Sequence, residues 1–253
     1  MSTTVISQAD LRQRSAVDRA PLLRWMIFTG ATIFGVSLLW HFGLVKLMIA
    51  SDRTYISSVI SVLYVAASLH CLWRTIAVSR EAEASRRIER GFAEGSLVMA
   101  DVASSNALPP GLIADHIRNL QLKAQTQGAG RLDQTLLLRG LADKLRGSNG
   151  LGAFAGDTLM KLGLLGTIIG FIIMLAPIAG LDAGDRALMK SSMGLMSDGM
   201  AVAMYTTLAG LVGSILVKIQ YYALDAATAQ VFSQAVALTE TRIVPALERR
   251  HVG

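Results

Sequence analysis

The sequence predicts an all-α integral membrane protein with four transmembrane helices and long cytoplasmic helical extensions. Of its 253 residues, 52% are hydrophobic and the mean hydropathy is +0.47, which is more apolar than an ordinary soluble domain. The apolar residues gather in four runs of about 20 residues, the length that a helix needs to cross the hydrocarbon core of a bilayer. Arginine residues concentrate beside these runs in the pattern of cytoplasmic flanks, which sets the orientation.

The N-terminal half contains the first two predicted spans. Residues 1–24 form a polar, basic tail without the apolar core and cleavage site of a signal peptide. We expect transmembrane helix 1 over residues 25–50 and transmembrane helix 2 over residues 55–78. Four arginines within residues 80–90 mark the cytoplasmic side, and the tail lies on the same side because two spans separate them.

Residues 79–156 are predicted to form a cytoplasmic helical loop. Residues 82–103 continue the second span as a charged helix, which ends before Pro109 and Pro110. Residues 112–124 and 132–145 place apolar side chains at helical spacing. Such short amphipathic helices cannot bury a large core alone, so we expect them to pack on the long helices.

The C-terminal half contains the other two predicted spans. Transmembrane helix 3 covers residues 157–180, a periplasmic loop covers 181–198, and transmembrane helix 4 covers 199–218. The cytoplasmic tail, residues 219–253, continues the fourth helix until Pro245, since no glycine or proline interrupts it earlier. Both termini are therefore expected in the cytoplasm.

Small and hydroxyl residues follow one stripe on each of the last two spans. At about 100° per residue, each stripe occupies one narrow face. In lipid, small residues allow helix backbones to approach closely. The hydroxyls have two interpretations: they bond back to carbonyls of their own helix, or they line an ion path. The stripe residues are Gly163, Thr167, Gly170 and Met174 in the third span, with Gly166 beside them, and Ala203, Thr207, Gly210 and Ser214 in the fourth.

No motif of an enzyme or of a metal site is visible. Cys71 is the only cysteine, and the four histidines lack ligand spacing. We therefore expect no catalysis, no metal and no cofactor. The net charge of +6 is explained by membrane topology, because aromatic residues are scarce outside the spans, and no nucleic-acid partner is expected.

The two stripes resemble those of the MotA/TolQ/ExbB proton channel family. The run Gly163-Leu164-Leu165-Gly166-Thr167, with Gly170, is similar to its GLLGT-x-x-G helix. Residues 203–211, AMYTTLAGL, are similar to its A-x-x-x-T-x-x-G-L helix. The resemblance implies a multi-pass protein of the bacterial inner membrane. It also implies a homo-oligomeric ring, a pentamer, around a single-span partner that resembles MotB, TolR or ExbD and carries a membrane aspartate.

The resemblance also implies roles for the stripe residues. Thr167 and Thr207 would face the partner's aspartate, with Thr206 as an auxiliary ligand and Ser214 also on the ion path. The glycines and Ala203 would permit close helix packing. The chain departs from the TolQ and ExbB pattern at Val202, where those proteins have a glutamate, and its four-span layout is more similar to MotA.

No acid lies on the two stripes. A threonine hydroxyl can solvate a passing cation but cannot store a proton at neutral pH, so this chain needs a titrating group from elsewhere. The resemblance implies the rest: a channel or stator subunit that works with the partner's aspartate, driven by the ion-motive force, to energise a cell-envelope process. A non-conducting scaffold of an envelope complex is the alternative. A secondary transporter also stays open, although neither internal repeats nor broken helices are visible.

Overall fold

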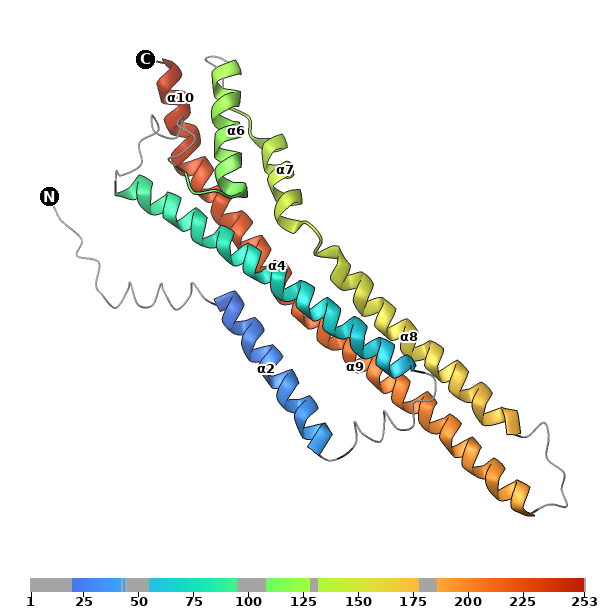
Figure 1. Cartoon of the computed structure of the whole chain (residues 1–253). Helices are drawn as coiled ribbons and strands as arrows, with labels where there is room; N and C mark the ends of the chain where they lie inside the picture. Colours follow the sequence, from blue (N-terminus) through green and yellow to red (C-terminus); the bar gives the residue numbers. More distant parts are fainter. Residues whose placement is uncertain are drawn as a thin grey trace. The chain divides into compact units, whose positions relative to one another are not determined.

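A computed structural model describes residues 20–41, 43, 55–94, 108–127, 132–177 and 186–252. Over these ranges the regular elements are helices and no strand occurs, so the all-α prediction is confirmed. The helices (Figure 1) are α2 (Ala20–His41), α4 (Ile56–Ala93), α6 (Leu112–Gln127), α7 (Thr135–Arg146), α8 (Gly150–Leu175), α9 (Arg186–Leu238), the π-helical turn η2 (Thr239–Ile243) and α10 (Val244–Val252).

Three stretches of the described residues are long and apolar enough to cross a membrane: Ile56–Phe92, Thr135–Leu175 and Met189–Glu248. Their most apolar windows are only 22% to 33% buried within the chain, which leaves apolar surface for lipid or for other subunits. The first predicted span, residues 25–50, lies partly outside the described residues. Its described part lies in α2, whose apolar stretch Thr29–Leu38 is shorter than a membrane span. The four-span layout therefore stays a prediction.

The helices divide into two compact units. One contains Trp25–Leu72 and Gly150–Tyr222, which include α8 and the first part of both α4 and α9. The other contains Trp73–Asn149 and Ala223–Gly253, which include α6, α7, α10 and the remaining part of α4 and α9. We call them the membrane unit and the loop unit. The long helices α4 and α9 each run through both.

In the membrane unit, Tyr221 joins three helices. Its hydroxyl lies 2.7 Å from Nδ1 of His70 and donates to the carbonyl oxygen of Ala67, 3.3 Å away, so it binds α9 to α4. Its ring fills the place of a side chain at Gly152 of α8, where an added Cβ would lie 2.0 Å from the ring. Only glycine permits this contact, and the tyrosine is buried as a result.

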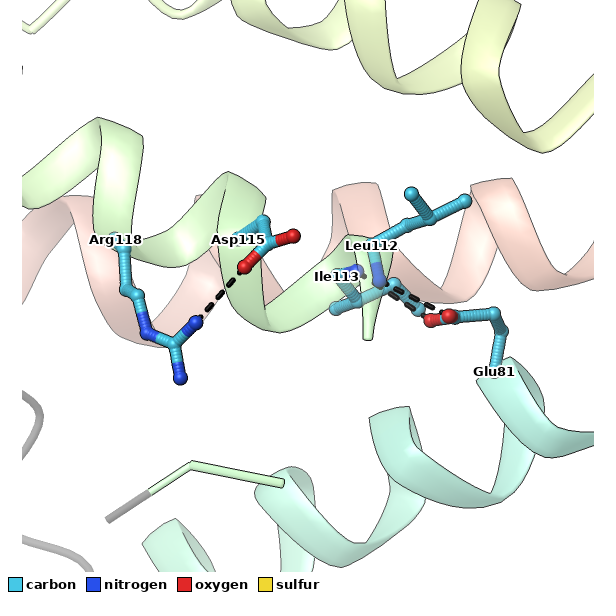
Figure 2. Close-up of polar contacts among 5 residues, drawn as sticks. All are labelled: Glu81, Leu112, Ile113, Asp115 and Arg118. Carbon is cyan, nitrogen blue, oxygen red and sulfur yellow. Dashed lines mark hydrogen bonds and ion pairs between the residues drawn. The ribbon is translucent and has the colours of Figure 1, made fainter. Parts of the chain in front are cut away.

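In the loop unit, α4 caps the first turn of α6. The carboxylate of Glu81 accepts hydrogen bonds from the backbone N–H groups of Leu112 at 2.9 Å and Ile113 at 3.5 Å (Figure 2). The first N–H groups of a helix have no partner inside it, and a carboxylate there also complements the helix dipole. One face of α6 is mainly apolar, and its Ile117 and Leu120 are fully buried. The helix α6 is thus held by the Glu81 carboxylate at its first turn and by the burial of its apolar face.

The end of α7 is capped in a corresponding way by Arg74 of α4. Its Nη2 donates to the carbonyl oxygen of Leu145 at 2.7 Å, and its Nε donates to Oδ1 of Asn149 at 3.2 Å. The turn needs Gly147, whose φ is +46° and whose Cβ, if present, would lie 2.8 Å from the guanidinium. Asn149 in turn donates to Asp225 of α9 at 2.9 Å. Polar contacts therefore tie the loop helices to both long helices.

Several helix ends differ from the sequence prediction. The continuation of the second span, expected to reach residue 103, ends at Ala93, and the helix of the third span begins at Gly150, before residue 157. The helix of the fourth span begins at Arg186, so residues 186–198, expected in the loop, are helical. The same helix does not end at Pro245, because α10 continues through it to Val252. Proline lacks the N–H that would bond to the preceding turn, and the helix changes to a π-helical turn, Thr239–Ile243, that ends two residues before it.

Replacing Glu81 by alanine is expected to open the first turn of α6. The loss of a capping carboxylate costs roughly 0.5–2 kcal/mol. The amide hydrogens of Leu112 and Ile113 should then exchange several-fold faster, as measured by hydrogen-exchange mass spectrometry on the detergent-solubilised protein. Glu83→Ala is the matched control: its carboxylate lies 3.7 Å from Arg87, and both side chains are 67% exposed. Equal exchange in the two variants would contradict the capping role.

His116 makes the loop unit sensitive to pH. Burial of this α6 side chain lowers the pKa of His116, and a hydrogen bond with Gln134 partly opposes the shift. The folded chain therefore binds its proton at lower pH than the unfolded chain, whose histidine titrates near about 6.5. The stabilisation is complete above that pH and is lost as the pH falls toward the folded-state pKa. The melting temperature should drop between about pH 7.5 and about pH 5.5, and less so in His116→Gln; identical drops would contradict this assignment.

Candidate functional site

The contact between α8 and α9 is made by backbone against backbone. An added Cβ on Gly170 would lie 2.6 Å from the amide nitrogen of Ala203, and one on Gly210 would lie 2.6 Å from the carbonyl oxygen of Leu159. Real Cβ atoms do not approach so closely, so these positions require glycine. We call this contact the seam. It is formed by Gly163, Gly166 and Gly170 of α8, and by Gly199, Ala203, Thr206 and Gly210 of α9.

Thr206 lies inside the seam. It is fully buried, and a Cβ on Gly166 would lie 2.2 Å from its Oγ1. Its hydroxyl donates to the carbonyl oxygens of Val202 at 2.8 Å and Ala203 at 3.1 Å. Within one chain, Thr206 therefore packs against α8. The family resemblance implied that Thr206 is an auxiliary ligand on the ion path, but in this chain its hydroxyl does not reach an open surface.

Thr207 is half-buried at the edge of the seam. Its hydroxyl lies 3.0 Å from the carbonyl oxygen of Ala203 in its own helix and 3.3 Å from the carbonyl oxygen of Gly163 in α8. Thr167 is also half-buried, and its hydroxyl donates to the carbonyl oxygen of Leu164 at 2.5 Å. Both hydroxyls thus bond to helix carbonyls, and that of Thr207 also reaches across to the other helix.

An open groove of about 420 Å³ runs along this edge of the seam. Thr167 and Ala203 both line it, and Ala203 lies one turn from Thr207. Thr167 follows Gly163 by one turn, and Thr207 follows Ala203 by one turn. Because α8 and α9 are antiparallel, with Gly163 beside Gly210 and Gly170 beside Ala203, the two threonines lie on the same side of the seam. The other lining residues are apolar: Ile168, Phe171, Ile172, Met174 and Met200.

Ser214 continues the Thr207 stripe but is not open. It lies two turns further along α9 and is 3% exposed. No acidic residue occurs on α8 between Asp157 and Leu175, or on α9 between Gly199 and Lys218. The seam therefore offers hydroxyl and carbonyl oxygens to a cation, without a carboxylate of its own. Among the described residues there is also no cluster of three or more His, Cys, Asp or Glu side chains that could hold a metal ion.

The sequence reasoning missed two contacts that complete the site. A Cβ on Gly199 would lie 2.5 Å from the amide nitrogen of Met174, so the seam extends one turn beyond Ala203. The four-residue spacing of Gly199 and Ala203 was a visible signal for this. The ion pair of Asp157 with Lys218, at 2.8 Å, had no such signal, because the partners lie far apart in the chain.

When the sequence is compared with known protein families, the part that contains the seam gives a match. Residues 121–236, which include α7, α8 and most of α9, match the model of the MotA/TolQ/ExbB proton channel family. This region of the chain is a member of that family. Neither a curated protein nor a solved structure gives a significant match.

The resemblance seen in the two motifs is therefore confirmed at the level of the family. The matched residues include all of α8 and every residue of the seam. Together with the three membrane-capable helices, this identifies a membrane protein whose matched region is of the MotA/TolQ/ExbB type.

Alanine at Gly210 is expected to loosen the seam. The new methyl group would meet backbone atoms of Leu159 and Gly163, which cannot move as a flexible side chain would. Overpacking of this kind costs about 1–3 kcal/mol, so the melting temperature in mild detergent should fall. Gly213→Ala is the matched control, because its Cβ would first meet Leu159 side-chain atoms at 3.7 Å, an ordinary contact. Equal stability of the two variants would contradict the backbone contact.

Proposed function

We propose that this chain is a channel and stator subunit of an ion-motive-force-driven motor in the bacterial inner membrane. The observation that carries the proposal is that the family match covers the helix pair in which Thr167 and Thr207 share one side of the seam. Hydroxyl oxygens inside a membrane can replace part of the hydration shell of a cation. The driven process acts on the cell envelope.

The conducting unit also includes a single-span partner that resembles MotB, TolR or ExbD and carries a membrane aspartate. Moving a cation through the membrane without polar partners costs several kcal/mol. The seam contributes hydroxyls but no carboxylate, so the titrating group comes from another chain. The open, apolar groove beside Thr167 supports this, because it could receive one face of a transmembrane helix.

The subunits form a ring of five around the partner, each with four spans and both termini in the cytoplasm. One chain cannot enclose a partner helix, and exposed apolar side chains cover the outer faces of the membrane helices, among them Phe171, Leu208 and Leu211. Such surface in a membrane protein faces lipid or a neighbouring subunit. The arginines of α4 support the orientation.

A non-conducting scaffold is the second candidate. The observation that favours it is that the hydroxyls of Thr167, Thr206 and Thr207 all bond to helix carbonyls in this chain. Threonines that only satisfy their own helix are ordinary in membrane proteins. A scaffold would need the glycines of the seam but not these hydroxyls.

Substitution of Thr207 by valine separates the two candidates. The change keeps the shape of the side chain and removes its oxygen, so the assembly should persist while ion flux falls roughly tenfold, the value of one hydrogen bond to a charged group. The tagged chain is purified from its native membrane with its co-purifying proteins, and flux into proteoliposomes is followed with a proton-sensitive or sodium-sensitive dye. Thr207→Ser should retain most of the flux.

Thr158→Val is the matched control. The hydroxyl of Thr158 donates to the carbonyl oxygen of Phe154 at 2.7 Å, the same bond type, but outside the seam. Its loss should leave the flux unchanged. Unchanged flux in the Thr167→Val, Thr207→Val double variant would overturn the motor proposal and favour the scaffold. Full flux from this chain alone would overturn the role proposed for the partner's aspartate.

A further inference from the structure

An ion pair lies at the end of the seam that the proposed topology turns toward the cytoplasm. It joins Asp157 of α8 to Lys218 of α9, with 2.8 Å between Oδ1 and Nζ. We propose that this pair forms the cytoplasmic mouth of the ion path. Asp157 attracts the departing cation, and Lys218 holds its carboxylate over the seam and partly neutralises it. This inference rests on the proposed function, because a scaffold has no ion path.

The lysine side chain crosses the seam to reach its partner. A Cβ on Gly156 would lie 3.0 Å from both Cγ and Cε of Lys218, so the aliphatic stem rests on this glycine. The side chains of the pair are 48% and 55% exposed, so this chain covers neither charge. The pair is fixed in place by the stem of Lys218 and is left uncovered by the rest of the chain, as a mouth requires.

The pair lies on the side of the seam that carries Thr207. Thr207 and Lys218 are 11 residues apart, which at about 100° per residue leaves only about 20° between their directions on α9. On α8 their contacts, Gly163 and Gly156, are two turns apart and share one face. A cation that leaves Thr207 along this face therefore comes to Asp157 and Lys218 about three turns later on α9.

The charges at the mouth set the local potential. Lys161 lies within electrostatic range of the Asp157 carboxylate, so two ammonium groups surround one carboxylate. A surplus of positive charge lowers the local concentration of cations, and a surplus of negative charge raises it. Removal of the lysine and removal of the aspartate should therefore change the flux in opposite directions. A pair that only holds the two helices together would change it in the same direction.

The test compares Asp157→Asn with Lys218→Gln in the co-purified complex. The complex is reconstituted into phosphatidylcholine vesicles, which carry no net surface charge, and flux is measured with the same trapped dyes. We expect flux to fall about two- to fivefold in Asp157→Asn and to rise by a similar factor in Lys218→Gln, the size of an exposed charge interaction. Both changes should shrink at high salt, which screens exposed charges. Asp157→Glu and Lys218→Arg preserve the charges and should conduct as the unchanged chain does.

The melting temperature of each variant distinguishes the mouth from a simple clamp. Equal losses of flux and stability in Asp157→Asn and Lys218→Gln, both restored by the exchanged pair Asp157→Lys, Lys218→Asp, would overturn the inference. So would unchanged flux in both single variants while Thr207→Val still lowers the flux, a result that leaves the proposed function intact. Absence of flux in the unchanged complex would instead overturn the proposed function.

Discussion

The backbone contact between α8 and α9 determines the geometry of the rest of the candidate site. Lipid tails are as apolar as leucine side chains, so two membrane helices gain nothing from leaving lipid for each other unless their backbones pack closely. Gly163, Gly170 and Gly210 permit that packing because each lies where a Cβ would meet the other backbone. The approach brings the hydroxyl of Thr207 within 3.3 Å of the carbonyl oxygen of Gly163.

Charge is distributed differently in the two units. In the membrane unit, α8 and α9 carry their ion pair at one end of the seam, and the seam itself contains only hydroxyls and carbonyls. In the loop unit, charged side chains bind helix ends: Glu81 at the first turn of α6 and Arg74 at the last turn of α7. A charge at a helix end is stabilised by the helix dipole and by water, whereas inside the bilayer it needs a partner.

The hydroxyl bonds explain how one helix pair supports two candidate functions. A threonine that donates to a carbonyl still has oxygen lone pairs, so Thr207 satisfies its own helix and could also solvate a cation. The hydroxyl of Thr206 is enclosed by Gly166 and lacks that access in a single chain. The two adjacent threonines therefore differ in whether a cation can reach their hydroxyls, and not in the chemistry of those hydroxyls. In the proposed motor, conduction then depends on a carboxylate that this chain does not contribute.

The sequence by itself determined the helical class, the apolar helices of the last two spans and the family. These follow from hydropathy, length and local spacing, which act within one helix and do not depend on a neighbour. It also placed Gly163, Gly170 and Gly210 on faces suited to close packing.

Only the tertiary structure decided which side chains the seam buries and which it leaves open. Thr206 and Thr207 are adjacent, so one helix places them about 100° apart, and only the position of α8 distinguishes them. The contact of Tyr221 with Gly152 and the pairing of Asp157 with Lys218 likewise join residues that are distant in the chain. Such contacts depend on the register between two helices, which backbone packing sets and no local pattern records.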